Sequence, residues 1–307
     1  MSQVSSLLTR LRYDETLYSA LARASMYLGS PPRSRLHNAL FGVDISIFDD
    51  LPVGVGHVIE SGAFGPADVD GAVHEWTMFP YYAHFSPVDQ AREAMHRMES
   101  TKQWPHEPLG CGIAAPALLR FCRSCRMDML EQHADAWWRR THQLPSTLVC
   151  PDHGETLLVS MVTRERRRSS YLAATEAECP QDSPAVTGVE NGAAQADLLT
   201  LARGGDALLD MRCDTHPDDR RERYLQRLDQ VSMLNRIGEA NLAAITALID
   251  SRWWRILEYW PGLTRNGRSA QGWLGALLMG RHGSPPLHHL LLEGALHWAE
   301  LRAGRKS

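Results

Sequence analysis

Two segments decide the fold: Phe121-Cys122-Arg123-Ser124-Cys125 and Val149-Cys150-Pro151-Asp152-His153-Gly154. Between them lies a third, Trp137-Trp138-Arg139-Arg140-Thr141-His142-Gln143-Leu144-Pro145. The first segment holds two cysteines separated by two residues. After a spacer of 24 residues, the second holds a cysteine and a histidine with the same gap. Each pair can place two side chains around one ion from a tight turn, and four such ligands satisfy the tetrahedral preference of zinc. Because the protein fills all four positions, we expect one structural zinc ion, bound by Cys122, Cys125, Cys150 and His153.

Residues 118–165 are interpreted as a zinc-ribbon module around these ligands. β-branched and apolar residues at 147–149 and 157–162 predict strands on both sides of the second ligand pair. Trp137 and Trp138 are large apolar groups in a module too small to build its own core. They are expected to pack over the metal turns or to dock the ribbon onto a helical domain, with base stacking as the alternative.

Residues 1–117 carry short stretches of helical periodicity, which predict an N-terminal helical domain. Helices are expected at residues 13–27, with Asp14 as the cap, at 36–41 and at 55–59. Two more are expected within 66–99, separated by a break at Pro80, the second starting at Ser86-Pro87. Short helices joined by tight turns are compatible with a helix-turn-helix domain, but they also occur in folds that never touch DNA.

The second half of the chain is expected to be a linker followed by more helices. Residues 166–195 are rich in Ser, Ala, Glu, Pro and Gly, which favours a linker or long loop. Residues 196–307 form a C-terminal helical domain, with an interruption at Gly204-Gly205 and a strong helix from Pro217. The predicted fold class is therefore mainly α with a small zinc-ribbon (β) module.

Composition places the chain among ordinary soluble globular proteins, with 44% hydrophobic and 22% charged residues. No apolar run is long enough to span a membrane and the N-terminus lacks a signal layout, so a cytoplasmic location is expected. The net charge of −4 provides no global field toward nucleic acid. Nucleic-acid or partner contact is therefore expected only locally, at Arg164, Arg166, Arg167 and Arg168. A solvated hairpin tip or linker is the alternative.

The remaining chemistry-bearing residues form no convincing catalytic group. Cys179, Cys213 and His216 leave a second metal site open, although reduced unpaired cysteines explain them as well. Acidic pairs occur at the starts of helices or in turns, where carboxylates cap backbone amides. They are Asp14-Glu15, Asp49-Asp50, Asp68 with Asp70, and Asp218-Asp219. The sequence therefore favours a protein that is not an enzyme, with a metal-dependent nuclease as a competing hypothesis.

Several separate segments together resemble the TniQ/TnsD family, and especially its shorter TniQ type. The most specific are the segments 137–145 and 149–154 quoted above. Others lie at residues 13–23, 40–42, 50–52 and 77–85, and at Trp273, Arg281 and 286–292 near the C-terminus. Before the segment 286–292, the basic residues usual in the family are reduced to Arg281 and His282.

The resemblance implies a bacterial target-site selector of transposons that move by a DDE transposase and an AAA+ regulator. It implies the same four zinc ligands and, as partners, the AAA+ regulator and either target DNA or a DNA-bound guide-RNA surveillance complex. Arg281 is a further candidate contact residue, and homodimerisation is left open. The protein would be cytoplasmic and nucleoid-associated when active. A sequence-specific transcription factor using the N-terminal helices is the alternative within the binding class.

Overall fold

A computed structural model of the chain describes residues 10–42, 45, 50–100, 103–109, 116–188, 192–212, 217–260, 263, 271–279 and 284–304. Six helices precede the metal module within this part: α1 (Leu17–Tyr27), α2 (Arg33–Phe41), α3 (Val55–Glu60), α4 (Val69–Trp76), α5 (Phe79–Ala83) and α6 (Val88–Glu99). The module contains β1 (Leu118–Phe121), α7 (Arg123–His133), α8 (Arg140–Gln143), β2 (Leu158–Thr163) and α9 (Arg164–Ser169). After it come α10 (Ala193–Leu209), α11 (Pro217–Gln230), α12 (Leu242–Trp253), the 3-10 helix η1 (Leu257–Tyr259), α13 (Gln271–Met279) and α14 (Pro286–Gly304).

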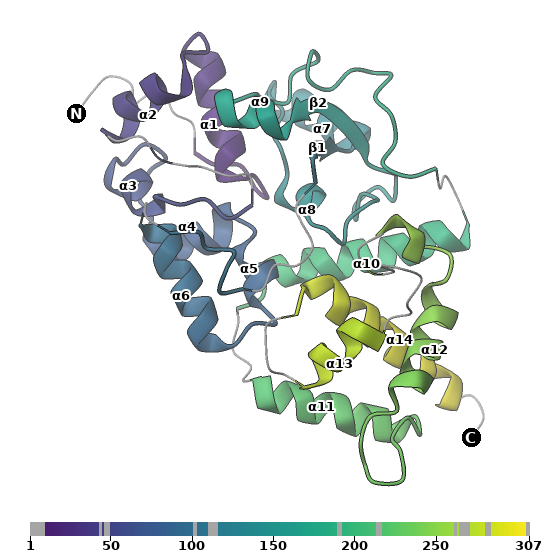
Figure 1. Ribbon diagram of the computed structural model, residues 1–307. Coiled ribbons are helices and arrows are strands. Elements are labelled where there is room, and N and C mark those ends of the chain that lie inside the picture. The colour runs from purple at the N-terminus through teal and green to yellow at the C-terminus, as the bar shows by residue number, and fades with distance from the viewer. Residues whose placement is uncertain are drawn as a thin grey trace.

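The predicted fold class is confirmed at the level of element type: the structure is mainly helical with a small antiparallel pair of strands (Figure 1). None of the helices in the described ranges is both long and apolar enough to cross a membrane.

Two local expectations for the N-terminal helices are wrong. Helix α1 is capped by Thr16, whose hydroxyl accepts from the Ser19 amide at 3.0 Å, and not by Asp14. Pro80 does not break a helix; it lies in the first turn of the additional helix α5. A proline is tolerated there because the amide it lacks would have no intrahelical acceptor.

The strand pairing of the metal module also differs from the expectation. Strand β2 pairs antiparallel with β1, with Leu118 opposite Thr163 and Phe121 opposite Leu158. The predicted strand at 147–149 is reduced to one bridge between Val149 and Thr156. The partner of β2 therefore precedes the first cysteine pair, and helix α7 begins directly after Cys122 and contains Cys125.

Residues 171–187 lack helix or strand, but they pack against the module. The amides of Val159 and Met161 in β2 donate to the carbonyls of Pro184 and Glu178, both at 2.9 Å. Tyr171 and Cys179 on this segment are buried. The segment thus covers the free edge of β2.

Helix α10 crosses the middle of the molecule between the metal module and α14 (Figure 1). The predicted interruption at Gly204-Gly205 is wrong, because α10 runs through both glycines. A Cβ on Gly205 would lie 2.2 Å from the Ser146 hydroxyl oxygen, and one on Gly204 would lie 3.0 Å from a Leu290 methyl. The glycines therefore allow close approach and do not end the helix.

The buried apolar residues form two clusters. The first joins the N-terminal helices to the module and includes Phe121, Trp138, Cys150 and the end of α10. The second joins the C-terminal helices and includes Leu148 and Val149 of the module. The module thus contributes to both cores.

Candidate metal centre

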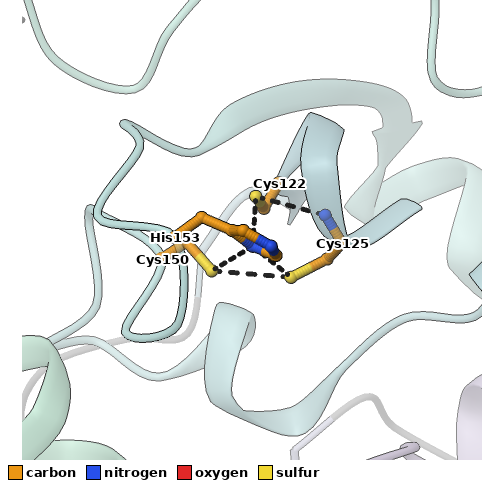
Figure 2. A group of neighbouring side chains, drawn as sticks. All are labelled: Cys122, Cys125, Cys150 and His153. Atoms are coloured by element: carbon orange, nitrogen blue, oxygen red, sulfur yellow. Dashed lines mark hydrogen bonds between the residues drawn. The ribbon is translucent and has the colours of Figure 1, made fainter. Parts of the chain in front are cut away.

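The first ligand pair is positioned by the junction of β1 with α7. Cys122 follows the strand directly and is the N-cap of α7, so its sulfur faces the Cys125 amide at 3.5 Å. Cys125 therefore points to the same side, one turn into the helix. Figure 2 shows both sulfurs directed toward the second pair.

The second ligand pair lies on a tight turn. The Gly154 amide donates to the Cys150 carbonyl at 2.8 Å, and the Cys150 amide donates to the Glu155 carbonyl at 2.7 Å. Gly154 has a φ of +68°, a conformation that a side chain would strain. The turn brings His153 back over Cys150, facing the first pair.

The four side chains meet at one point, as the spacing predicts (Figure 2). Nδ1 of His153 lies 3.3 Å from the Cys125 sulfur and 3.6 Å from the sulfurs of Cys122 and Cys150. The sulfurs of Cys125 and Cys150 are 3.5 Å apart, and all four ligand atoms lie within 4.8 Å of one another. Metal–sulfur bonds of about 2.3 Å and a metal–nitrogen bond of about 2.0 Å in a tetrahedron place the ligand atoms roughly 3.5–3.8 Å apart. The group therefore fits a tetrahedral ion.

A carboxylate orients the histidine ligand. While Nδ1 of His153 faces the sulfurs, its Nε2 lies 3.3 Å from the Asp128 carboxylate on α7. A hydrogen bond of this kind fixes the histidine ring and strengthens its basicity toward a metal. Asp128 was not among the residues that the sequence singled out.

Positive charge on the other side balances the thiolates. Arg139 donates to the Cys125 sulfur at 3.1 Å, to Asp14 at 2.8 Å and to Asp152. His142 is buried, and its Nε2 lies 3.8 Å from the Cys125 sulfur. Three thiolates around a divalent ion leave one net negative charge, which the Arg139 guanidinium offsets in a poorly solvated site.

Without an ion, the three thiols hold their protons unequally. Contacts with Cys122 and Cys125 lower the pKa of Cys150 far below its usual value, and contacts with Cys125 and Cys150 raise the pKa of Cys122. Contact with Cys122 lowers the pKa of Cys125, but contact with Cys150 and burial outweigh it and raise the value to about 12. Because cysteines bind a metal as thiolates, metal binding at this centre releases protons and weakens at low pH.

The tryptophans and the segment after them attach this centre to the rest of the molecule. The backbone amide of Trp138 donates to the Ser19 hydroxyl of α1 at 2.9 Å. The indole N–H of Trp138 donates to the Leu172 carbonyl at 2.7 Å. Trp137 donates to the Tyr13 carbonyl at 3.1 Å. The predicted docking of the module onto the helical domain is thus seen in these contacts.

The arginines predicted as contact residues fall into different environments. Arg164, Arg166 and Arg168 on α9 are exposed, and Arg166 forms a bidentate pair with Glu178, with both contacts at 2.6 Å. Arg167 is buried and donates to the carbonyls of Val162 and Pro116 at 3.3 and 3.2 Å. The structure therefore gives Arg167 a place inside the fold, and the contact prediction stays with the other three.

Three predicted residues lie outside the described part of the chain. They are Arg281, Cys213 and His216. Cys179 is buried, and burial raises the pKa of its thiol to about 12. The second metal site therefore stays an open prediction.

Sequence comparison identifies relatives of the segment that holds the centre. A family model described as TniQ matches residues 7–157, which include all four candidate ligands. The chain is also similar to the Escherichia coli protein "Transposon Tn7 transposition protein TnsD", with 28% identity over 183 residues. That match covers 55% of this chain and 35% of the relative, so the chain matches about a third of the relative's length.

Proposed function

Because the chain belongs to the TniQ/TnsD family through residues 7–157, we propose that it selects the target site of a transposon. In this role it binds a target and recruits the AAA+ transposition regulator to it. The observation that carries the proposal is the family match over a segment that contains the whole Cys3His centre. The proposed role needs rigid docking surfaces and no catalysis by this chain.

The ion of the centre is proposed to be zinc in a structural role. Three sulfurs and one imidazole nitrogen at tetrahedral separations are typical of zinc. With all four positions supplied by the protein, the ion has no vacant position for a substrate. Cys122, Cys125, Cys150 and His153 would hold it, and the ion would lock β1, α7 and the turn at 150–154 into one unit.

Two modes of targeting are compatible with this role. In one, the chain binds target DNA directly; in the other, it docks on a guide-RNA surveillance complex already bound to DNA. Direct binding neutralises phosphates and is steeply salt-dependent, whereas docking on a protein surface depends more on shape and apolar contact.

The test is a staged binding experiment with the purified full-length chain. Immobilised duplex DNA and an immobilised DNA-bound guide-RNA complex are each incubated with the chain, and then with the AAA+ regulator and ATP. We expect the regulator to be retained only when the chain is present on one of the two targets. If neither immobilised target retains the chain or the regulator, the proposal is contradicted. Tight binding to one short duplex sequence without any recruitment of the regulator would instead indicate a transcription factor.

A further inference from the structure

Helices α2 and α9 place a concentration of arginine at one end of a molecule that is acidic overall. Together, Arg33–Phe41 and Arg164–Ser169 contain six arginines and one glutamate, a net charge of +5, in a chain of net charge −4. Figure 1 shows the two helices at the same end, on either side of α1. We propose that this surface, the α2–α9 arginine patch, binds the phosphate backbone of duplex DNA.

The two helices are tied together by one arginine. Nη1 of Arg33, the first residue of α2, donates to the carbonyl of Arg167 at 2.8 Å. Its guanidinium also lies over the Tyr171 ring, 4.8 Å from the centroid. Tyr171 in turn bonds through its hydroxyl to the buried His37 of α2 at 2.7 Å. These contacts fix the first turn of α2 against the last turn of α9, so the patch is rigid.

The members of the patch that carry the proposal are exposed. Arg164 and Arg168 are four residues apart and therefore lie on the same side of α9, while Arg35 lies in the exposed first turn of α2. Like charges at this helical spacing are unfavourable in the free protein. A bound polyanion converts that repulsion into attraction, because each guanidinium can then oppose a phosphate.

The acidic residues on the two described helices leave the patch positive. The charge of Glu178 is neutralised by Arg166 in the bidentate pair, and the acidic residue on α9 itself is Glu165. The first turn of α2 contains no acidic residue, so the positive end of its helix dipole adds to the field. Duplex DNA offers one charge per about 1.7 Å of axis, which is a denser anion than a protein surface presents.

This inference rests on the proposed function, since a target-site selector works at DNA, and it narrows that function to direct contact with the duplex. The test measures binding of the full-length chain to fluorescent duplex DNA between 50 and 200 mM salt, where the Debye length falls from about 14 Å to about 7 Å. The variants are Arg164→Gln/Arg168→Gln on α9 and Arg35→Gln on α2. The matched control is Arg92→Gln/Arg223→Gln, which removes two exposed arginines from α6 and α11.

At 0.1 M salt, each lost phosphate contact lowers the affinity by about eightfold and the salt slope by about 0.9. We therefore expect roughly 60-fold weaker binding for the α9 double variant and about eightfold for Arg35→Gln, with the control unchanged. Metal content and circular dichroism check that each variant is folded. An equal loss of DNA affinity in the control variant would show that binding depends on the net charge of the protein and not on this patch, and would overturn the assignment.

Two further outcomes would also overturn it. One is a wild-type chain without salt-dependent binding to duplex DNA; the other is single-stranded RNA of the same length bound as tightly and weakened by the same substitutions. Recruitment of the AAA+ regulator to a guide-RNA complex is measured in parallel. If recruitment survives while the patch variants bind DNA normally, the patch assignment fails and the proposed function stands.

Discussion

Arg139 connects the metal centre to a residue 125 positions earlier in the chain. It contacts the Cys125 sulfur on one side and the buried Asp14 on the other. Burial lowers the pKa of Arg139, but the charges of Asp14 and Cys125 outweigh this and raise it above its usual value. Asp14 itself has a φ of +55°, a conformation that non-glycine residues rarely adopt. The local geometry at Asp14 thus serves this contact and not a helix cap.

Replacing Arg139 should weaken metal binding without removing a ligand. Residues that contact metal ligands typically contribute 10–100-fold to metal affinity, and we expect a loss of about that size for Arg139→Gln. Competition with a chromogenic chelator measures it. Arg123→Gln, an exposed neighbour on α7, is the control and should bind metal as the wild type does. An unchanged affinity in Arg139→Gln would show that the thiolates need no cationic neighbour.

Removing a ligand should abolish stoichiometric binding. We expect Cys122→Ser and His153→Ala to contain much less than one zinc per chain by elemental analysis and to lose the structure of residues 118–165. Folding and metal binding are coupled in small modules, since the ion supplies the energy that a small core cannot. Cys179→Ser is the control, because Cys179 lies outside the group. One zinc per chain in the ligand variants would refute the assignment.

The sequence was informative about the ligands and uninformative about their surroundings. The four ligands lie in two short segments, so their spacing alone predicts that they meet. The contacts of Asp14 with Arg139 and of Arg120 with the Thr147 carbonyl join residues that are distant in sequence, and no local pattern encodes them. For the same reason, Arg167 resembled an exposed charge although its guanidinium is buried.

At the scale of the elements, α10 depends on two glycines at which the sequence predicted a break. Gly205 faces the Ser146 hydroxyl oxygen so closely that no Cβ fits between them. We expect Gly205→Ala to destabilise the protein by about 1–3 kcal/mol, as overpacking does. Thermal or urea denaturation followed by circular dichroism measures the change.

Gly275 provides the matched control for this prediction. A Cβ there would lie 3.8 Å from a Leu242 methyl, an ordinary contact, within helix α13. Gly275→Ala should therefore stabilise the protein by about 0.5–1 kcal/mol through helix propensity. Stabilisation by both alanines would mean that α10 packs less closely than the structure indicates.

Element boundaries were least predictable where pairing or packing is distant. Strand β1 is a short segment, and its partner β2 comes after both ligand pairs, so the sequence did not reveal it. Helix α7 was missed because Cys122 serves as its N-cap, a position that serine, threonine or aspartate usually occupies. Helix α11 was predictable, because its apolar residues repeat at helical spacing between charged ones.

At the scale of the whole molecule, a buried histidine joins the two cores. The ring of His289 on α14 stacks on Phe85 of the first core, with centroids 3.9 Å apart. Burial, with the charges of Arg220, His288 and His84, holds the pKa of His289 well below its usual value. The Tyr224 hydroxyl lies 2.9 Å from Nδ1 of His289 and 3.0 Å from the Glu293 carboxylate. Burial also lowers the pKa of the neighbouring His288 to about 4.

The two buried histidines, His288 and His289, should make the protein less stable in mild acid. Both histidines are neutral in the folded state and charge more readily when unfolded. Their contribution is therefore complete above pH ~6.5 and is lost as the pH falls toward the folded pKa values. With a folded pKa of about 4 for His288, His288→Gln should reduce the loss between pH 7 and pH 5 by about 2 kcal/mol. Parallel denaturation of wild type and variant at both pH values measures this, and equal slopes would contradict it.

The burial of the adjacent residues Val149 and Cys150 in different cores has a kinetic consequence for the metal ion. Val149 is buried in the second core and Cys150 in the first, so one peptide bond is held from both sides. A metal mounted on a free loop escapes whenever that loop opens. Here Cys150 can withdraw only when both cores loosen, whereas His153 is exposed, so we expect the ion to leave more slowly than from ligands on a free loop. A molecule that acquires its ion during folding would then keep it longer than a site on a free loop would, even where free metal is scarce.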